Sequence, residues 1–196
     1  MTSAFPGVLT DPSTFRRVFA DPGEPLVLVI VDPGAGTLLR TTIDGINQIN
    51  TIGAQLRTII YGASSALLES MGCSDEDISR LGLLEPGCAS LLPVIGSEVN
   101  LTIALGQASY SHLSDHPHAF GRVPCIVGPG VSLDTRRRPR IDCEWDGQNA
   151  RGLSDLLAHL LSPRPPQRDE AASRPHSPAL HVSNYVLQND WGIGDE

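Results

Sequence analysis

The segment from Leu26 to Val31 constrains the fold more than any other part of this 196-residue chain. It is a continuous run of apolar, mostly β-branched residues, Leu-Val-Leu-Val-Ile-Val, and it is closed by Asp32-Pro33-Gly34. A run of this length, bounded by turn residues, is typical of a strand that is buried on both faces. We therefore expect this segment to be a central strand of a sheet.

A second pattern lies between residues 44 and 71, where apolar residues recur three or four positions apart. This period predicts a long α-helix, with Asp44 as its N-cap and Gly72 as its C-terminal stop. Gly53 and Gly62 lie inside the predicted helix, where each glycine lowers helix stability by about 1 kcal/mol relative to alanine. We expect these small residues to allow close packing against another helix, in this chain or in a second subunit. The apolar positions are Ile46, Ile49, Ile52, Leu56, Ile59, Ile60, Ala63, Leu67 and Leu68.

The rest of the domain shows patterns of shorter elements, in which strands follow one another more often than they alternate with helices. This order favours an α+β domain with a mixed or antiparallel sheet, one long helix packed on it and a C-terminal helix. In chain order the expected elements are a short acidic helix over residues 75–81 capped by Ser74, a hairpin of strands at 91–95 and 98–105, a strand over 123–127, a half-exposed strand over 140–146, and a helix from Asn149 to Leu161.

The composition changes abruptly after Ser162. Residues 1–162 are expected to form the globular domain, residues 163–179 a Pro-rich linker that cannot bury enough apolar area to fold alone, and residues 180–196 an extended docking arm. Tyrosine and tryptophan dominate interface energetics when they enter a pocket, so the arm is predicted to bind protein. Its candidate partner-binding residues are Leu180, Val182, Tyr185, Leu187 and Trp191.

Composition and charge exclude several classes of function. All 14 basic residues are arginine, so the chain has no lysine for a Walker A loop, for a protein-kinase strand or for Schiff-base chemistry. The formal net charge of −8 makes nucleic acid an unlikely partner. We find no secretory signal, no membrane-length apolar run and no CxxC pair, so we expect free thiols and a cytoplasmic protein, or one in a particle assembled inside the cell.

One cluster of residues is suited to metal binding. His112, Asp115, His116 and His118 lie within seven residues, and imidazole and carboxylate groups are ligands for zinc or iron. The order differs from HExxH, and Pro117 disfavours a helical backbone at His116. A polar, solvent-exposed loop is the alternative interpretation of this segment.

Two glycine-rich turns and one basic run complete the candidates. The turn at residues 32–37 follows a buried strand, where α/β proteins place phosphate loops or acidic metal ligands. It lacks the GxGxxG spacing, and without lysine it cannot be a Walker A loop, so a simple strand-ending turn is the favoured interpretation. The segment at residues 128–130 is interpreted as a turn, and we assign it no chemical role. Arg136, Arg137, Arg138 and Arg140 could clamp phosphate or pair with carboxylates across an interface. They are interpreted as a solvated connection, a surface for an acidic protein, or a nucleic-acid contact.

These observations assign no catalytic residue and no cofactor, and they favour a function other than catalysis. The first hypothesis is a structural or assembly subunit of a larger complex, such as a virion or similar particle, which self-associates or binds other proteins through its arm and its close-packed helix. The second is a small metal-dependent enzyme that uses the histidine cluster. The third is a regulatory module that binds an acidic partner through the arginine run.

Overall fold

The computed structural model describes residues 23–53, 55–132 and 141–162. The chain divides into two units, residues 1–162 and 163–196, and the described residues all belong to the first. Within the described part of the chain, no helix has the length and apolar character needed to cross a membrane.

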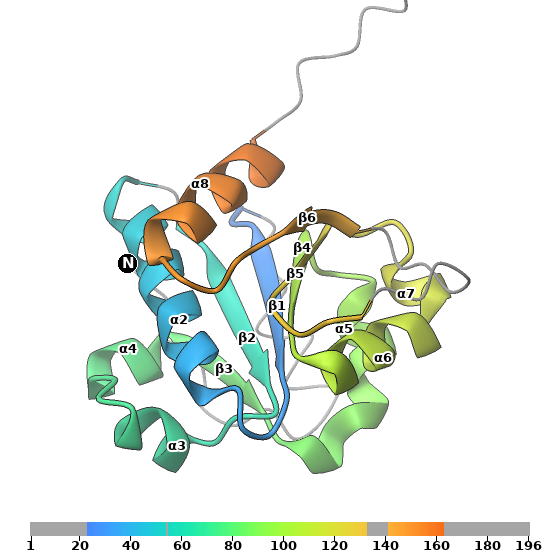
Figure 1. The fold of residues 1–196 in the computed structure, drawn as a ribbon, viewed down its shortest axis with the longest axis horizontal. Coiled ribbons are helices and arrows are strands. Elements are labelled where there is room, and N and C mark those ends of the chain that lie inside the picture. The colour runs from blue at the N-terminus through green and yellow to red at the C-terminus, as the bar shows by residue number, and fades with distance from the viewer. Residues whose placement is uncertain (1–22, 54, 133–140, 163–196) are drawn as a thin grey trace, which may run out of the picture. The chain divides into compact units, whose positions relative to one another are not determined.

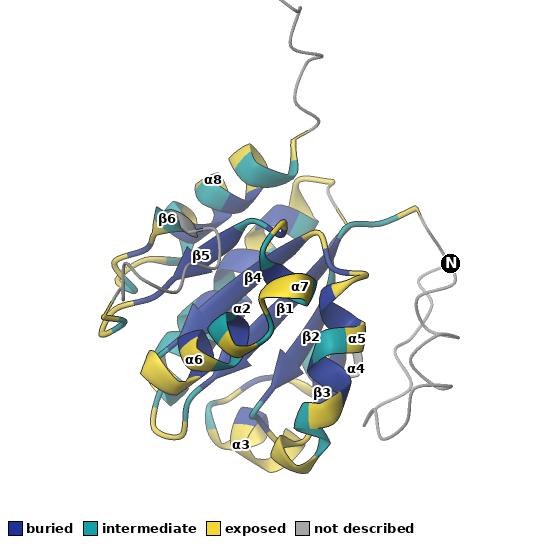
Figure 2. Cartoon of the chain, turned by 90° about the vertical axis from the view of Figure 1, so that its right-hand side faces the viewer, coloured by how far each residue is buried: buried dark blue, intermediate teal, exposed yellow. Residues whose placement is uncertain are grey.

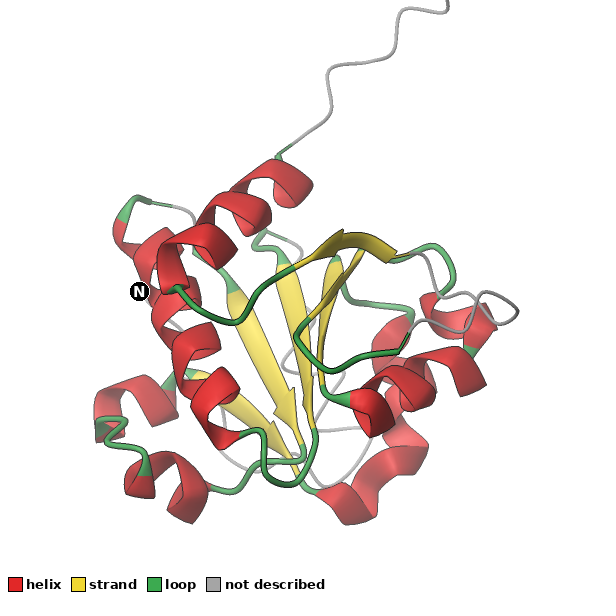
Figure 3. Ribbon diagram, in the orientation of Figure 1, coloured by secondary structure: helices red, strands yellow, loops and turns green. Residues whose placement is uncertain are grey.

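The first unit is built on a sheet of six strands. Every neighbouring pair is parallel, and the spatial order is β3-β2-β1-β4-β5-β6 (Figure 3). This is the strand order of a doubly wound, Rossmann-like α/β fold. The strands are β1 (Leu26–Val31), β2 (Arg57–Tyr61), β3 (Leu81–Leu84), β4 (Leu101–Leu105), β5 (Cys125–Val127) and β6 (Ile141–Glu144).

The expectation of an α+β domain with a mixed or antiparallel sheet is therefore wrong, because all the observed strand pairs are parallel. The prediction of a buried central strand is confirmed. β1 lies between β2 and β4, and all six of its residues are buried. Parallel neighbours need a crossover connection between them, so helices cover both faces and the strand reads as an unbroken apolar run.

Helices form a layer on each face of the sheet (Figure 1). The alternating side chains of β1 divide between two cores: Val27, Val29 and Val31 face one layer, and Leu26, Leu28 and Ile30 face the other. Most described strand residues are buried, and exposed residues lie on the outer sides of the helices and in loops (Figure 2). The first layer contains α2 (Gly36–Thr51), α3 (Ser65–Ser70), α4 (Asp75–Ser79) and α8 (Ala150–Leu161); the second contains the 3₁₀ helix η1 (Pro86–Leu91), α5 (Leu92–Gly96), α6 (Gln107–Asp115) and α7 (Pro117–Phe120).

The predicted long helix over residues 44–71 is instead helix, strand and helix. Asp44 lies inside α2, where it pairs with Arg40, so it is not an N-cap. Gly53 (φ 101°) follows α2 and Gly62 (φ 95°) follows β2, so the two glycines terminate elements rather than interrupt a helix. A side chain at Gly62 would also overlap the carbonyl oxygen of Val31. The apolar spacing through β2 fits a helical period by coincidence, because a five-residue strand is too short to show its own period clearly.

Close helix packing does occur, but at a different glycine. At Gly45 in α2, an added Cβ would lie 2.8 Å from the carbonyl oxygen of Ala150 and 3.2 Å from Leu153, both in α8. The missing side chain lets α8 approach the backbone of α2 closely. The partner of this close contact is therefore a helix of the same chain.

Of the other predicted elements, some are wrong and some are confirmed. The hairpin at residues 91–105 is wrong, because Pro93 sits in the first turn of helix α5, where proline is well tolerated, and only residues 101–105 form a strand. The strands at 123–127 and 140–146 are present as β5 and β6. Helix α8 begins after Asn149, whose side chain accepts a hydrogen bond from the amide of Gly152, as expected of an N-cap.

Candidate functional site

The carboxyl ends of β1 and β4 form the topological switch point of the sheet. From β1 the chain turns into α2 on one face, and from β4 it turns into α6 on the opposite face. In doubly wound folds, ligands bind in the crevice outside this point. The turn at residues 32–37, for which a simple strand-ending turn is the favoured interpretation, follows β1 at this switch point.

Asp32 closes this crevice with its own carboxylate. The carboxylate accepts hydrogen bonds from the amides of Ala108 (2.8 Å) and Ser109 (2.6 Å) and from the Ser109 hydroxyl (2.5 Å). Gly106 has φ 111°, and a Cβ there would lie 2.5 Å from Cγ of Asp32, so only glycine fits beside the carboxylate. The first turn of α6 thus holds an anion supplied by the protein, and these amides are not available to a phosphate.

A second contact extends from the same turn of α6. The side-chain carbonyl of Gln107 accepts a hydrogen bond from the amide of Ser132 (2.6 Å), and the Gln107 amide nitrogen donates to the Ser132 carbonyl (3.4 Å). At the other end of this loop, the amide of Gly128 donates to the carbonyl of Ala104 (2.9 Å). The loop after β5 is therefore fixed to β4 at one end and to α6 at the other.

That loop forms one wall of a pocket of about 400 Å³ at the carboxyl ends of β5 and β6. Such a volume is in the range that takes a small molecule. The opposite wall is the turn after β6, and the lining residues are Val127, Gly128, Pro129, Gly130, Val131, Glu144, Trp145 and Asp146.

Local hydrogen bonds and packing shape the second wall. The indole nitrogen of Trp145 donates to the carbonyl of Asn149 (3.2 Å), and the Asp146 carboxylate accepts from the amide of Gln148 (2.9 Å). Gly147 (φ 73°) lets the turn pass close to Leu38 of α2 and to Pro129. These contacts place the turn against the start of α2 and against the loop after β5.

The pocket is acidic. Glu144 and Asp146 are both exposed, whereas no arginine or histidine is among its lining residues. The two ion pairs found in the described residues, Arg40–Asp44 and Arg80–Glu76, lie in other elements. Its carboxylates therefore favour a positively charged ligand and disfavour an anion.

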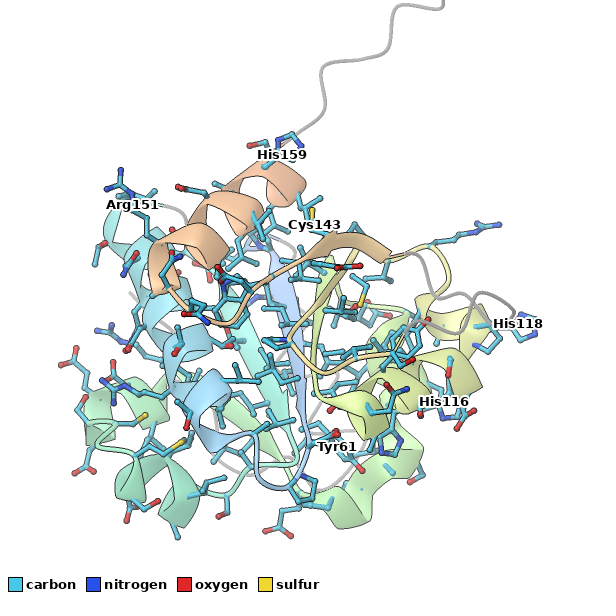
Figure 4. The ribbon with its side chains drawn as sticks, in the orientation of Figure 1. Tyr61, His116, His118, Cys143, Arg151 and His159 are labelled. Carbon is cyan, nitrogen blue, oxygen red and sulfur yellow. The ribbon has the colours of Figure 1, made fainter. Side chains whose placement is uncertain are left out.

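The structure separates the predicted metal ligands. His112 lies in α6 with its ring against the edge of Tyr61, at a centroid distance of 5.5 Å and an interplanar angle of 84°. Asp115 ends α6, His116 (φ −121°, ψ 59°) joins α6 to α7, and His118 lies exposed in α7. Figure 4 shows His116 and His118 away from Tyr61. Among the residues that the structure describes, no three His, Cys, Asp or Glu side chains are grouped to hold a metal ion.

Tyr61 lies at the carboxyl end of β2, beside His112. Its hydroxyl donates to the carbonyl of Pro86 (3.0 Å), and the pKa of Tyr61 is raised, chiefly by burial and then by the neighbouring Cys88. The phenol therefore stays protonated at neutral pH and can act as a hydrogen-bond donor but not as a base.

The predicted partner-binding residues lie outside the described part of the chain. This applies to Arg136, Arg137, Arg138 and Arg140, and to Leu180, Val182, Tyr185, Leu187 and Trp191. The assembly role assigned to the arm and the acidic-partner role assigned to the arginine run remain predictions. The other interface proposed for assembly, a close-packed helix at Gly53 and Gly62, is replaced by the contact between α2 and α8.

Three groups that shape the pocket were not identified from the sequence: Gln107, Glu144 and Asp146. The alternation over residues 140–146 placed Glu144 and Asp146 on an exposed strand face but gave no sign of a facing wall. Gln107 is 25 residues from its partner Ser132, and no short motif reports such a contact. The turn at residues 128–130 was the available signal, because glycine and proline after a short strand mark a backbone that bends sharply.

Comparisons with known proteins give little to set beside this geometry. No family model matches the chain, and no curated protein matches its sequence. One similar solved structure is the apo form of the glycosyltransferase GlyE from Streptococcus pneumoniae TIGR4, at 8% identity and a TM-score of 0.45. The match covers 78% of this chain and 39% of the glycosyltransferase chain. A likeness at this level carries no argument about function, so the site is interpreted from its own residues.

Proposed function

We propose that this domain binds a small organic cation, such as an amine with a short apolar body, in the pocket at the carboxyl ends of β5 and β6. The observation that carries the proposal is the pocket itself, at the edge of the sheet where doubly wound folds bind ligands. No reaction is assigned, and the proposed function is binding.

The choice of a cation follows from the charges on both sides of the switch point. Glu144 and Asp146 line the pocket, and Asp32 occupies the first turn of α6. A phosphate or carboxylate ligand would meet acidic groups at both places. An ammonium group would meet the carboxylates of Glu144 and Asp146, while Pro129 and Val131 supply apolar contacts for its carbon chain.

The test uses the fluorescence of Trp145, which lies in the wall of the pocket. The chain has two tryptophans, so Trp191→Phe leaves Trp145 as the only indole reporter. This protein is titrated with agmatine and butylamine as cations, and with butyrate and inorganic phosphate as anions. We expect saturable changes with the cations and none with the anions.

Charge-removing variants connect the signal to the pocket. Glu144→Gln and Asp146→Asn should each weaken agmatine binding about fivefold, since an exposed ion pair contributes up to ~1 kcal/mol. Asp155→Asn, which removes an exposed carboxylate from α8, is the matched control and should leave the affinity unchanged. Absence of agmatine binding up to about 10 mM, or equal binding of butyrate, would refute the proposal.

A further inference from the structure

The pocket depends on a residue that does not line it. Residues 128–132 form a wall between two fixed points, the bond from Gly128 to Ala104 and the pair of bonds between Gln107 and Ser132. Among the described residues, these are the hydrogen bonds that tie this segment to the rest of the domain. Pro129 and Gly130 are exposed between the two points.

Gln107 is well placed to hold the far end of this wall. Its side chain presents an acceptor to the backbone N–H of Ser132 and a donor to the backbone carbonyl of the same residue, so a single planar amide engages both main-chain groups of Ser132. Its own backbone lies between Gly106 and Ala108, in the turn that the Asp32 carboxylate fixes. The side chain therefore extends from a rigid base, which is a requirement for positioning a loop.

We propose that Gln107 is the positioning residue of the pocket, which sets the distance between residues 128–132 and the Glu144–Asp146 wall and thereby the affinity for a cation. The effect on affinity rests on the proposed function, but the effect on the loop does not. A residue of the switch-point helix thus acts on a pocket formed by the next two strands.

The first test needs no ligand and measures hydrogen exchange at the amide of Ser132 in the full chain by NMR. Gln107→Ala should lower the protection of this amide about three- to tenfold, which corresponds to the loss of one ordinary hydrogen bond. Gln48→Ala, which removes an exposed glutamine from α2, is the matched control and should have no effect.

Gln107→Glu provides a pH-dependent rescue. The ionised carboxylate accepts from the Ser132 amide but cannot donate to the Ser132 carbonyl, which it repels. The protonated acid can do both, because it has the same shape as the amide and carries a donor. Protection at Ser132 should therefore recover in Gln107→Glu as the pH falls below about 4, near the ordinary pKa of glutamate, and should not recover in Gln107→Ala.

The second test measures agmatine affinity through Trp145. We expect Gln107→Ala to weaken binding about three- to tenfold without changing the protein's thermal unfolding by more than a degree or two, since the residue is exposed. Unchanged protection at Ser132, or loss of protection with unchanged agmatine affinity, would overturn the inference. If the parent protein does not bind agmatine while the exchange results hold, the failure lies in the proposed function and the loop contact stands.

Discussion

Replacement of Asp32 by alanine tests the central feature of the switch point. The change removes the acceptor for three hydrogen bonds, from the amides of Ala108 and Ser109 and from the Ser109 hydroxyl. These losses are unequal. Ala108 is exposed, so water replaces the carboxylate there, and the Ser109 hydroxyl keeps its contact with the carbonyl of Leu105 (3.3 Å).

The largest cost therefore falls on the Ser109 amide, because Ser109 is fully buried (0% exposed). An unsatisfied buried donor costs about 1–3 kcal/mol, and loss of a charged cap at a helix N-terminus adds ~1 kcal/mol. We expect the free energy of unfolding to fall by about 3 kcal/mol, and the melting temperature by roughly 6–12 °C for a domain of this size. Asp32→Asn keeps one acceptor oxygen and should lose about half as much.

Equilibrium unfolding in urea, followed by circular dichroism, measures these differences, and the denaturant slope should not change. Asp115→Ala is the control on the same helix. It removes a carboxylate from the C-terminal end of α6, where a negative charge is unfavourable, and should be neutral or slightly stabilising. A loss below ~1 kcal/mol for Asp32→Ala, or equal losses for the alanine and asparagine variants, would show that the carboxylate does not hold this turn.

Four further predictions concern three single residues and the C-terminal segment. Gly45→Ala should destabilise the protein by about 1–3 kcal/mol in thermal unfolding, although alanine favours a helix, because its Cβ would press on Leu153 of α8. Thr58→Val should be neutral or stabilising in the same assay, because the Thr58 hydroxyl is buried without a hydrogen-bond partner. The pKa of Asp77 is lowered, first by the hydroxyl of the serine that caps α4, so its contribution to stability is complete above its unfolded pKa and is lost as the pH falls through the lower folded value. Asp77→Asn should therefore reduce stability at neutral pH and make it fall less between pH 5 and 2, as measured by urea unfolding at each pH. Deletion of residues 163–196 should leave thermal unfolding little changed but abolish self-association or partner binding in light scattering; full assembly of the truncated chain would contradict the docking role.

The sequence predicted elements whose pattern is local and strong. β1 carries a six-residue apolar run, and α8 has both an N-cap asparagine and a regular leucine stripe, so each was identified with its place in the chain. β2 was missed because Leu56, Ile59 and Ile60 are spaced like one face of a helix, and a strand of five residues has little room to show alternation. Together with the hairpin expected over residues 91–105 and the unpredicted strand β3, this error changed the expected fold class.

The site was harder to predict than the fold, for a physical reason. Its walls come from the carboxyl ends of β5 and β6, which become neighbours only through the strand order of the whole sheet. The sequence shows the acidic residues after one strand and the glycines of a turn after another. It does not show that the two segments meet at the same edge of the sheet. The histidine cluster is the opposite case. Its residues are close in sequence, but the structure places them in α6, in the connection after α6 and in α7.

The close contact at Gly45 also has a consequence during synthesis of the protein. α2 and α8 are separated by almost the whole domain, and a ribosome that adds about 5–20 residues per second needs roughly 5–20 seconds to make the intervening stretch of about 100 residues. During that interval the surface of α2 at Gly45, and the core residues that Leu153 and Leu157 later join, lack α8 as a partner. The nascent chain therefore leaves this part of α2 uncovered by α8 until α8 is synthesised.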